Sequence, residues 1–347
     1  MTRREWIQGA GVALLPLAGA RAEAARMPDM GGAPAGFPAN ARAAREANKP
    51  FDFIEHCHNL GFGVVETRLT STDPAAIRQM RARLETWQMR AIVDVPLPRT
   101  DADLPAYEAN VKAAADAGAV SMHTAMTQRR YEQFDTLEAF RRDFERCQAT
   151  IARAEPVLRK HRMRLGIENH KGWRSAEQAA WLRRVSSEWV GVHFDFGNNI
   201  ALCEDPNDTL HNLLPFVFAC HLKDMAVEPY DDGFLLSEVP LGEGFLDLPG
   251  MVAAVRAKDG KTPFDLEMIT REPLKIPVYT GKYWATFDDS FSPLPGRDLA
   301  HTLDLVRRHK PKEPLPRTAG LDTAAFVRLE DDCVRKSIDY ARARLNL

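Results

Sequence analysis

The stretch 164–170 reads R-L-G-I-E-N-H and places Glu168 at the end of a short apolar run. The same design recurs along the chain, because other apolar runs also close on a residue that can bind a metal ion. These are V-G-V-H-F-D-F-G-N with Asp195, V-F-A-C-H-L-K-D with His221, and P-F-D-L-E-M with Glu267. Short apolar runs bounded by polar residues are typical of buried strands. The pattern therefore predicts a parallel sheet with polar side chains at its strand ends.

Helical periodicity fills the gaps between these runs, so strands and helices alternate. We expect strands at 63–69, 90–95, 119–125, 164–168, 189–196, 217–221 and 264–269, with a poorly formed first strand within 30–37. Helices are expected at 51–60, 73–84, 101–117, 136–160, 175–185, 205–214, 247–257, 298–308 and 323–344. Eight such units predict an α/β protein, a (β/α)8 TIM barrel with a C-terminal helical extension. The alternative is a doubly wound open sheet, but no Gly-rich nucleotide loop follows any strand.

The barrel is predicted to occupy residues 23–310 and the helical extension residues 311–347. We expect the helix at 298–308 to be the eighth barrel helix. The last helix is expected to pack on the outer wall, although a contact in a homo-oligomer is an alternative use of it.

Residues 1–22 resemble a twin-arginine export signal. Arg3 and Arg4 precede an apolar stretch from Gly9 to Ala20, and Ala20-Arg21-Ala22 has the form of a cleavage site. The apolar stretch is shorter than the ~20 residues that a membrane-spanning helix needs. We therefore expect a periplasmic protein without a stable membrane anchor.

Composition narrows the class of partner. The formal charge is -2, 45% of residues are hydrophobic, and no long basic block is present, so a nucleic-acid partner is not expected. The five cysteines are widely spaced and include no C-x-x-C pair, which excludes a zinc ribbon or a disulfide framework. Most are expected to be buried thiols, with one disulfide left open in an oxidising periplasm.

The C-terminal ends of all strands meet on one face of a barrel, so Glu168, Asp195, His221 and Glu267 should converge there. Three carboxylates and one imidazole form a hard donor set that suits one divalent ion. We expect Mn²⁺ first, with Mg²⁺, Co²⁺ or Zn²⁺ as alternatives. Any one of these residues alone could instead cap the following helix.

Neighbouring polar residues are candidates for substrate binding. Residues i and i+2 share one face of a strand, which places His170 beside Glu168 and Lys223 beside His221, both near the rim. His123 lies on the fourth predicted strand, and Glu243 follows two residues after Leu241 in a glycine-containing loop. That loop either approaches a ligand or simply turns the chain into the next helix. His193 should lie deeper, where a structural role is as reasonable as a ligand role.

Five motifs in this order, I-E-N-H, H-F-D-F-G-N, H-L-K-D, P-L-G-E-G-F and L-E-M, resemble the xylose isomerase-like TIM-barrel family of sugar phosphate isomerases and epimerases. The resemblance covers roughly residues 27–308. It implies one divalent ion held by Glu168, Asp195, His221 and Glu267. In the ketose epimerases of this family, the two glutamates also act as the acid/base pair on opposite faces of the substrate.

Two positions depart from the epimerase pattern. Asn198 stands where a histidine follows the metal-binding aspartate, and Val227 stands where an arginine follows the metal-binding histidine. The pattern for ketohexose 3-epimerisation is therefore incomplete, and Asn198 becomes a candidate for substrate binding. The DNA-repair endonucleases of the superfamily need additional histidines and a basic surface, which this chain lacks.

These features predict a metal-dependent isomerase or epimerase that removes a proton α to a carbonyl and forms an enediolate. An exported protein meets free sugars, so we expect a small, unphosphorylated keto-sugar as substrate. Two alternatives stay open: a lyase or dehydratase acting on a 3-keto-glycoside or polyol, and a catalytically silent barrel that binds carbohydrate.

Overall fold

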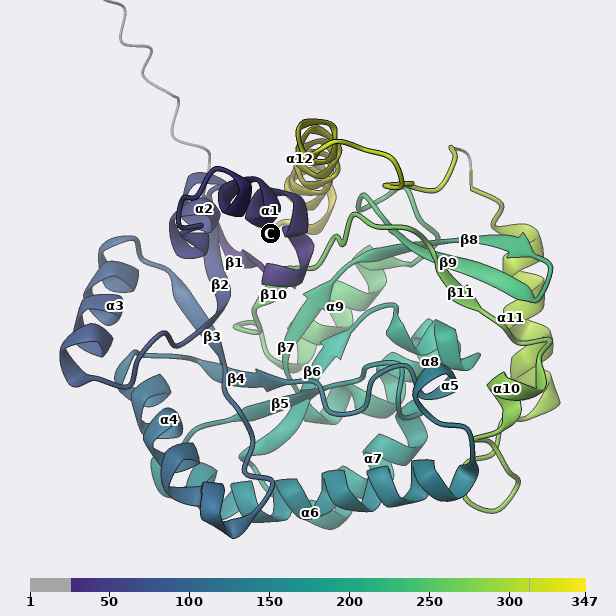
Figure 1. Cartoon of the computed structure of the whole chain (residues 1–347), viewed down its shortest axis with the longest axis horizontal. Coiled ribbons are helices and arrows are strands. Elements are labelled where there is room, and N and C mark those ends of the chain that lie inside the picture. Colours follow the sequence, from purple (N-terminus) through teal and green to yellow (C-terminus); the bar gives the residue numbers. More distant parts are fainter. Residues whose placement is uncertain (1–25, 312) are drawn as a thin grey trace, which may run out of the picture.

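The fold is a closed barrel of eight parallel strands, seen in a computed structural model that describes residues 26–311 and 313–347 (Figure 1). The export signal predicted at 1–22 lies outside the described residues. Around the barrel the strand order is β1-β10-β7-β6-β5-β4-β3-β2. The barrel strands are β1 (Met27–Gly32), β2 (Phe62–Arg68), β3 (Arg90–Asp94), β4 (Ser121–Thr124), β5 (Leu165–Glu168), β6 (Val190–Asp195), β7 (Val217–Leu222) and β10 (Phe264–Leu266). The predicted fold class is thus confirmed.

Helices connect these strands and cover the outside of the barrel (Figure 1). Several begin where the sequence predicts, because an aspartate caps the first turn: the Asp73 carboxylate accepts from Ala75 N at 2.9 Å, and Pro74 follows it. The helices are α1 (Pro38–Glu46), α2 (Phe53–Asn59), α3 (Pro74–Thr86), α4 (Leu104–Asp116), α5 (Arg130–Gln133), α6 (Leu137–His161), α7 (Ser175–Val185), α8 (Pro206–Leu213), α9 (Leu248–Lys258), α10 (Gly281–Trp284), α11 (Gly296–Arg308) and α12 (Thr323–Tyr340), which ends in a π-helical turn at Ala341–Leu345.

The first strand begins earlier than the sequence predicts. β1 spans Met27–Gly32, whereas a strand was expected within 30–37. Pro34 and Pro38 have no N–H to donate to a ladder, and they begin a short 3-10 turn and α1 instead. The expected strand at 30–37 is therefore wrong in its second half.

A second, antiparallel sheet was not predicted. It consists of β8 (Asp224–Tyr230), β9 (Gly233–Val239) and β11 (Leu274–Ile276), in the order β11-β9-β8. β8 and β9 lie in the segment between β7 and α9, where a long loop was expected, and β11 follows β10. The turn Asp231-Asp232-Gly233 joins β8 to β9, and Asp-Gly is a recognised hairpin signal. Gly233 has φ +155°, and a Cβ there would lie 2.2 Å from the carbonyl oxygen of Ile276.

The two C-terminal helices cover different parts of the molecule. α11, which was expected to be the eighth barrel helix, packs against the small sheet, where Val306 joins Val227 and Phe234 in one apolar cluster. α12 packs against α1 on the barrel itself, and its Cys333, Val334 and Ile338 belong to the main core. Figure 1 shows α11 beside β8 and β11, and α12 beside α1.

One buried carboxylate joins α12 to the start of the barrel. Glu330 on α12 is fully buried and accepts hydrogen bonds from the backbone N–H groups of Ala39 (2.7 Å) and Asn40 (3.0 Å). These groups belong to the first turn of α1, whose N–H donors have no partner within the helix. Glu330 on α12 thus provides acceptors for the N–H groups at the start of α1.

Successive side chains of a barrel strand point alternately outward, into the core beneath the helices, and inward, into the barrel interior. Val65 faces the helices and joins the main apolar core, whereas Val64 lies in a small inner cluster with Ile92 and Ala219. Residues two positions further along the inward face are Glu66, Asp94 and His221. The interior therefore changes from apolar to polar toward the C-terminal ends of the strands.

All five cysteines are buried free thiols, so the described residues contain no disulfide bond. Within the described residues, no helix combines the length and apolar character required to cross a membrane.

Candidate functional site

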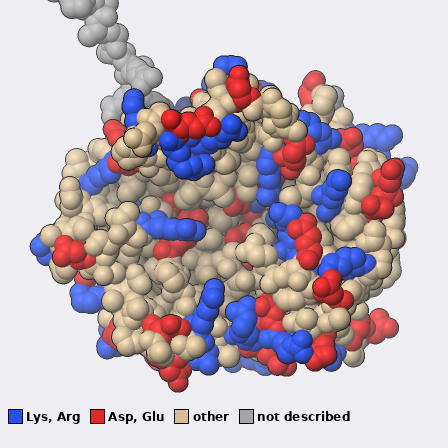
Figure 2. Space-filling model, in the orientation of Figure 1, with Lys and Arg blue, Asp and Glu red and all other residues tan. Residues whose placement is uncertain are grey.

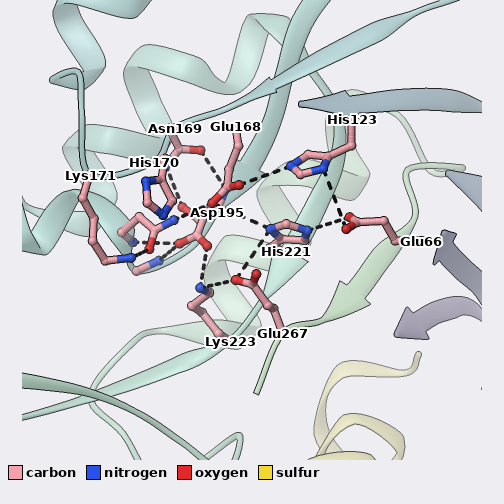
Figure 3. Close-up of polar contacts among 12 residues, drawn as sticks. Glu66, His123, Glu168, Asn169, His170, Lys171, Asp195, His221, Lys223 and Glu267 are labelled. Carbon is pink, nitrogen blue, oxygen red and sulfur yellow. Dashed lines mark hydrogen bonds and ion pairs between the residues drawn. The ribbon is translucent and has the colours of Figure 1, made fainter. Parts of the chain in front are cut away.

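Four side chains converge at the C-terminal mouth of the barrel, as the sequence predicts. Glu168 ends β5, Asp195 ends β6, His221 lies on β7 and Glu267 directly follows β10. Strand register aligns them, since Asp195 pairs with His221 and His221 with Asp265. One donor atom from each of the four lies within 4.8 Å of the others, and all four residues are buried (Figure 3).

The His221 ring is held in one orientation by a carboxylate behind it. Its Nε2 lies 2.8 Å from Oε2 of Glu66 on β2. Its Nδ1 lies 3.6 Å from Glu267 Oε2 and 4.0 Å from Glu168 Oε1, and has no hydrogen-bond partner within the described chain. A metal-binding histidine commonly donates its second ring N–H to a carboxylate in this way. The geometry leaves Nδ1 as a donor atom for an ion.

The donor set fits a divalent cation. Three oxygen donors and one imidazole nitrogen suit Mn²⁺, Mg²⁺ or Co²⁺ better than a soft metal. Without an ion, burial would lower the pKa of His221, but Glu267 and Glu66 raise it to about 10. A proton on His221 therefore balances the carboxylates in the absence of the ion.

Asp195 is fixed by its neighbours on two strands. Its Oδ1 accepts from Gly197 N at 2.8 Å and Asn198 N at 2.7 Å, while its own backbone N–H donates to Asn169 Oδ1 at 2.7 Å. Asn169 also donates to the Asp195 carbonyl at 2.8 Å. The asparagine of the I-E-N-H motif therefore joins β5 to β6 and leaves Asp195 Oδ2 directed toward the cluster.

Lys223 is buried among the ligand carboxylates, deeper than its predicted place at the rim. Its Nζ lies 2.6 Å from Asp195 Oδ2 and also pairs with Glu267. Burial would lower the pKa of Lys223, but Asp195 and Glu267 raise it. Burial would likewise raise the pKa of Glu267, yet Lys223 and His221 lower it to about 2. Lys223 is thus a permanent cation that holds two of the four converging residues, Asp195 and Glu267.

Glu168 is oriented from two sides. Its Oε1 accepts from Asn198 Nδ2 at 2.7 Å, and its Oε2 lies 3.2 Å from His123 Nε2. The other ring nitrogen of His123 lies 2.8 Å from Asp94 Oδ1. Burial opposes charge on His123, but Glu66, Asp94 and Glu168 raise its pKa well above the usual value. His123 and Asn198, which the sequence predicts to bind substrate, lie in contact with Glu168 and position it.

His170 lines the mouth beside Glu168, as expected. Burial and the adjacent Lys171 lower the pKa of His170 to about 4, so its ring is neutral near pH 7. Its Nδ1 lies 3.3 Å from the carbonyl oxygen of Thr127, which acts only as an acceptor. Nδ1 therefore carries the proton, and Nε2 is left as a hydrogen-bond acceptor.

His193 lies below the cluster and packs between other rings. Its ring centroid is 4.1 Å from that of His221 and 4.6 Å from that of His123. Gly166 on the adjacent strand makes room for it, because a Cβ there would lie 2.9 Å from His193 N. Glu66, His123, His193 and His221 also have donor atoms within 4.8 Å of one another. Glu66 in this second group is bound to His221, so we interpret the second group as structural support for the group of Glu168, Asp195, His221 and Glu267.

The structure does not bring Glu243 into the site. Its side chain is 45% exposed and lies 3.2 Å from Lys336 on α12. The loop that carries it is bound instead by Asp224, whose carboxylate accepts from Gly242 N at 2.9 Å, Gly244 N at 3.0 Å and Leu246 N at 3.2 Å. The glycines turn the chain toward α9, which was one of the two readings of this loop.

The sequence reasoning missed Asn169, Lys171 and Arg271. It also missed two carboxylates of the site, Glu66 and Asp94. Each ends an apolar run, V-V-E and A-I-V-D, so the rule that selected Glu168 also applies to them. Only the closed barrel shows that β2 and β3 lie close enough to the other strands for both carboxylates to support His221 and His123.

A cavity of about 190 Å³ opens directly above the cluster. At about 30 Å³ for each water, it has room for roughly six water molecules, which suits a small polar ligand. Figure 2 shows a hollow near the centre of this face, with acidic side chains at its floor and basic side chains beside it. The lining includes Glu168, His170, Lys171, Asn198, Lys223, Glu267 and Arg271.

The fold and the cluster together define a TIM-barrel protein with its polar site at the C-terminal ends of the strands. The chain belongs to the xylose isomerase-like TIM barrel family, whose sequence model matches residues 51–285.

Comparison with individual proteins gives weaker likenesses. Over 106 residues the chain is 26% identical to the 3-oxo-isoapionate decarboxylase of Pectobacterium atrosepticum, a match that spans 30% of this chain and 38% of that protein. The solved D-allulose 3-epimerase from Methylomonas sp. has 14% identity and a TM-score of 0.52, covering 92% of this chain and 98% of that one. A solved L-ribulose 3-epimerase has 13% identity and a TM-score of 0.51, covering 92% and 97%. Both structural likenesses show the shared fold.

Proposed function

We propose that the protein is a divalent-metal-dependent sugar isomerase or epimerase that removes a proton α to a carbonyl of an unphosphorylated keto-sugar. The convergence of Glu168, Asp195, His221 and Glu267 below a small cavity is the observation that carries this proposal. A bound divalent ion would supply Lewis-acid polarisation of the sugar carbonyl. The family membership and the epimerase-like fold support the same reaction class.

Glu168 and Glu267 are the proposed proton-transfer groups. Burial would raise the pKa of Glu168, but His170, His123 and His221 hold it well below its usual value, and the pKa of Glu267 is also lowered. Both are therefore carboxylates at neutral pH and able to accept a proton. One carboxylate takes the α-proton while the C–H electron pair moves toward the carbonyl and gives an enediolate. Delivery of a proton to the opposite face, taken from solvent through the second carboxylate, gives an epimer. Return of the proton to the adjacent carbon, with transfer of the hydroxyl proton between the two oxygens, gives an isomer.

Two observations favour a lyase or dehydratase as a second candidate. Val227, where the epimerase pattern has an arginine, lies in the apolar core of the small sheet. Asn198, where that pattern has a histidine, is bound to Glu168 and Lys171. In this reaction the same enediolate electron pair expels a β-substituent, which leaves with a proton. The 26% identical relative is named a decarboxylase, another enzyme that breaks a bond of its substrate.

The test is exchange of the α-proton in D₂O, followed by NMR on Mn²⁺-loaded protein with ketoses and 3-keto-glycosides. Glu168→Gln and Glu267→Gln should each lower exchange by about 10²- to 10⁴-fold. Glu243→Gln is the control, because that side chain lies outside the cluster and should leave exchange unchanged. A protein that binds these sugars but exchanges none of their α-protons would be a carbohydrate-binding barrel and would refute the proposal. Release of the aglycone distinguishes the lyase from the epimerase.

The predicted export signal at residues 1–22 bears on the substrate. We propose periplasmic action, where free sugars are met. Fractionation of cells that express the chain tests this, with an Arg3→Lys, Arg4→Lys double variant expected to stay in the cytoplasm.

A further inference from the structure

Lys171 is a buried cation in the wall of the cavity. Its side chain is only 2% exposed, although it lines the same cavity as Glu168 and Glu267. Figure 3 shows it at the end of the cluster away from Glu66. Its ammonium donates to one side-chain atom, Oδ1 of Asn198. An ammonium has three N–H donors, so two donors are left for a ligand or solvent.

The other cations of the cavity have carboxylate partners, and Lys171 does not. Lys223 is held by Asp195 and Glu267, and Arg129 lies 2.7 Å from Glu132. Among the residues that the structure describes, no carboxylate oxygen lies within the 4.0 Å of an ion pair with Lys171. This difference marks Lys171 as the charge in the wall that is not compensated within the protein.

The carboxylate that most favours charge on Lys171 is already bound by another residue. Glu238 on β9 is 1% exposed, and its Oε2 accepts from Arg271 Nε at 3.1 Å. Burial would raise the pKa of Glu238, but Arg271, Lys223 and Lys171 lower it, so it is ionised. Glu238 attracts the Lys171 ammonium electrostatically but forms no ion pair with it. A buried ammonium without a paired anion is costly, and an anionic group in the cavity would remove that cost.

Asn198 places this cation next to the proposed chemistry. Its side-chain amide accepts from Lys171 through Oδ1 and donates to Glu168 through Nδ2 at 2.7 Å. One amide group therefore separates the ammonium from a proton-transfer carboxylate. A ligand held by Lys171 lies beside Glu168 without needing to enter the ion cluster.

We propose that Lys171 binds a carboxylate of the substrate, so that the substrate class is a keto-sugar acid rather than a neutral sugar. This inference rests on the proposed function and narrows it. A carboxylate is favoured over a phosphate dianion because Lys171 is the one described cation of the lining without a carboxylate partner, while Glu168 and Glu267 line the same cavity and would repel a second negative charge. Arg271, which also lines the cavity, adds positive potential behind Lys171.

Binding by calorimetry tests the inference without requiring turnover. The probes are 5-keto-D-gluconate, D-fructose and D-fructose 6-phosphate, each titrated into ion-free and Mn²⁺-loaded full-length protein. The keto acid should bind about tenfold or more tightly than fructose, since a hydrogen bond to a charged group contributes that much. Lys171→Met should remove this preference, because it should lower the affinity for the keto acid far more than the affinity for fructose. Lys171→Arg should retain part of the preference.

Lys261→Met is the matched control, because Lys261 is exposed and precedes β10 at the opposite end of the barrel. Methionine suits a buried site, so Lys171→Met should unfold at or above the wild-type temperature. Equal binding of the keto acid and fructose, or a preference that survives Lys171→Met, would overturn the inference. Tighter binding of the phosphate would overturn the carboxylate assignment. Selective acid binding without proton exchange would refute only the proposed function. Exchange of the keto acid's α-proton that is unaffected by Lys171→Met would refute only this inference.

Discussion

His221 Nε2 lies 2.8 Å from Glu66 Oε2, and this contact turns the Nδ1 atom of the same ring toward Glu168 and Glu267. A residue on β2 thus sets the orientation of a proposed ligand on β7, across the barrel interior. The contact fixes the ring without occupying the atom that would bind the ion.

Glu66→Gln should weaken Mn²⁺ binding by about 10- to 100-fold, because loss of the carboxylate behind a ligand histidine has effects of that size. Competition with a fluorescent chelator measures the change. Glu330→Gln is the matched control, since Glu330 is also buried but lies on α12 against α1, and the change should leave ion affinity unchanged. Unchanged affinity in Glu66→Gln would show that the ring is held by other contacts.

Ion affinity should rise with pH by about tenfold per unit between pH 7 and 9. His221 has a pKa raised to about 10 without the ion, so ion binding displaces one proton throughout this range. Lower pH favours the protonated form of His221 and therefore weakens ion binding. Calorimetry in buffers of different ionisation enthalpy should show release of about one proton per ion. Affinity independent of pH would place the ion elsewhere.

His170→Ala should weaken sugar binding by roughly five- to tenfold, as expected for loss of one hydrogen bond in a cavity. The neutral ring offers its Nε2 as an acceptor to a substrate hydroxyl. Ion affinity should stay at the wild-type value, because His170 is not among the four converging donors. His211→Ala, at an exposed position on α8, serves as the control.

Glu330→Ala should lower the free energy of unfolding by about 2–3 kcal/mol, because it leaves buried N–H groups of α1 without acceptors. Urea denaturation followed by circular dichroism measures the change. Glu243→Ala provides a comparison on the same helix interface: its pair with Lys336 is half exposed and should contribute less than about 1 kcal/mol. Equal effects of the two changes would contradict the role given to Glu330.

The barrel could be predicted because its signal is local. Each apolar run is long enough for one strand, and Asp73-Pro74 marks a helix start directly. The convergence of Glu168, Asp195, His221 and Glu267 then follows from topology alone, since parallel strands end on one face. The recurrence of apolar runs that end in a polar residue therefore supported both the predicted barrel and the predicted site.

Other features could not be predicted because they depend on contacts between distant segments. Lys223 was placed at the rim by strand alternation, yet ion pairs with Asp195 and Glu267 hold it inside. Glu243 lies in a motif that resembles a site, but Asp224 binds the glycines around it and turns the glutamate outward. The sequence predicted α12 as a helix, whereas the hydrogen bonds between Glu330 and the first turn of α1 could not be predicted.

The contact between Glu330 and the first turn of α1 also bears on the order in which the chain can fold as it is synthesised. β1 and α1 leave the ribosome well before β10, which pairs with β1, and α12, which binds α1. The barrel can therefore close only after β10 has been synthesised, and Glu330 can reach α1 only after that. A ribosome that stalls before β10 would release a chain with an open sheet edge at β1, which chaperones and proteases recognise.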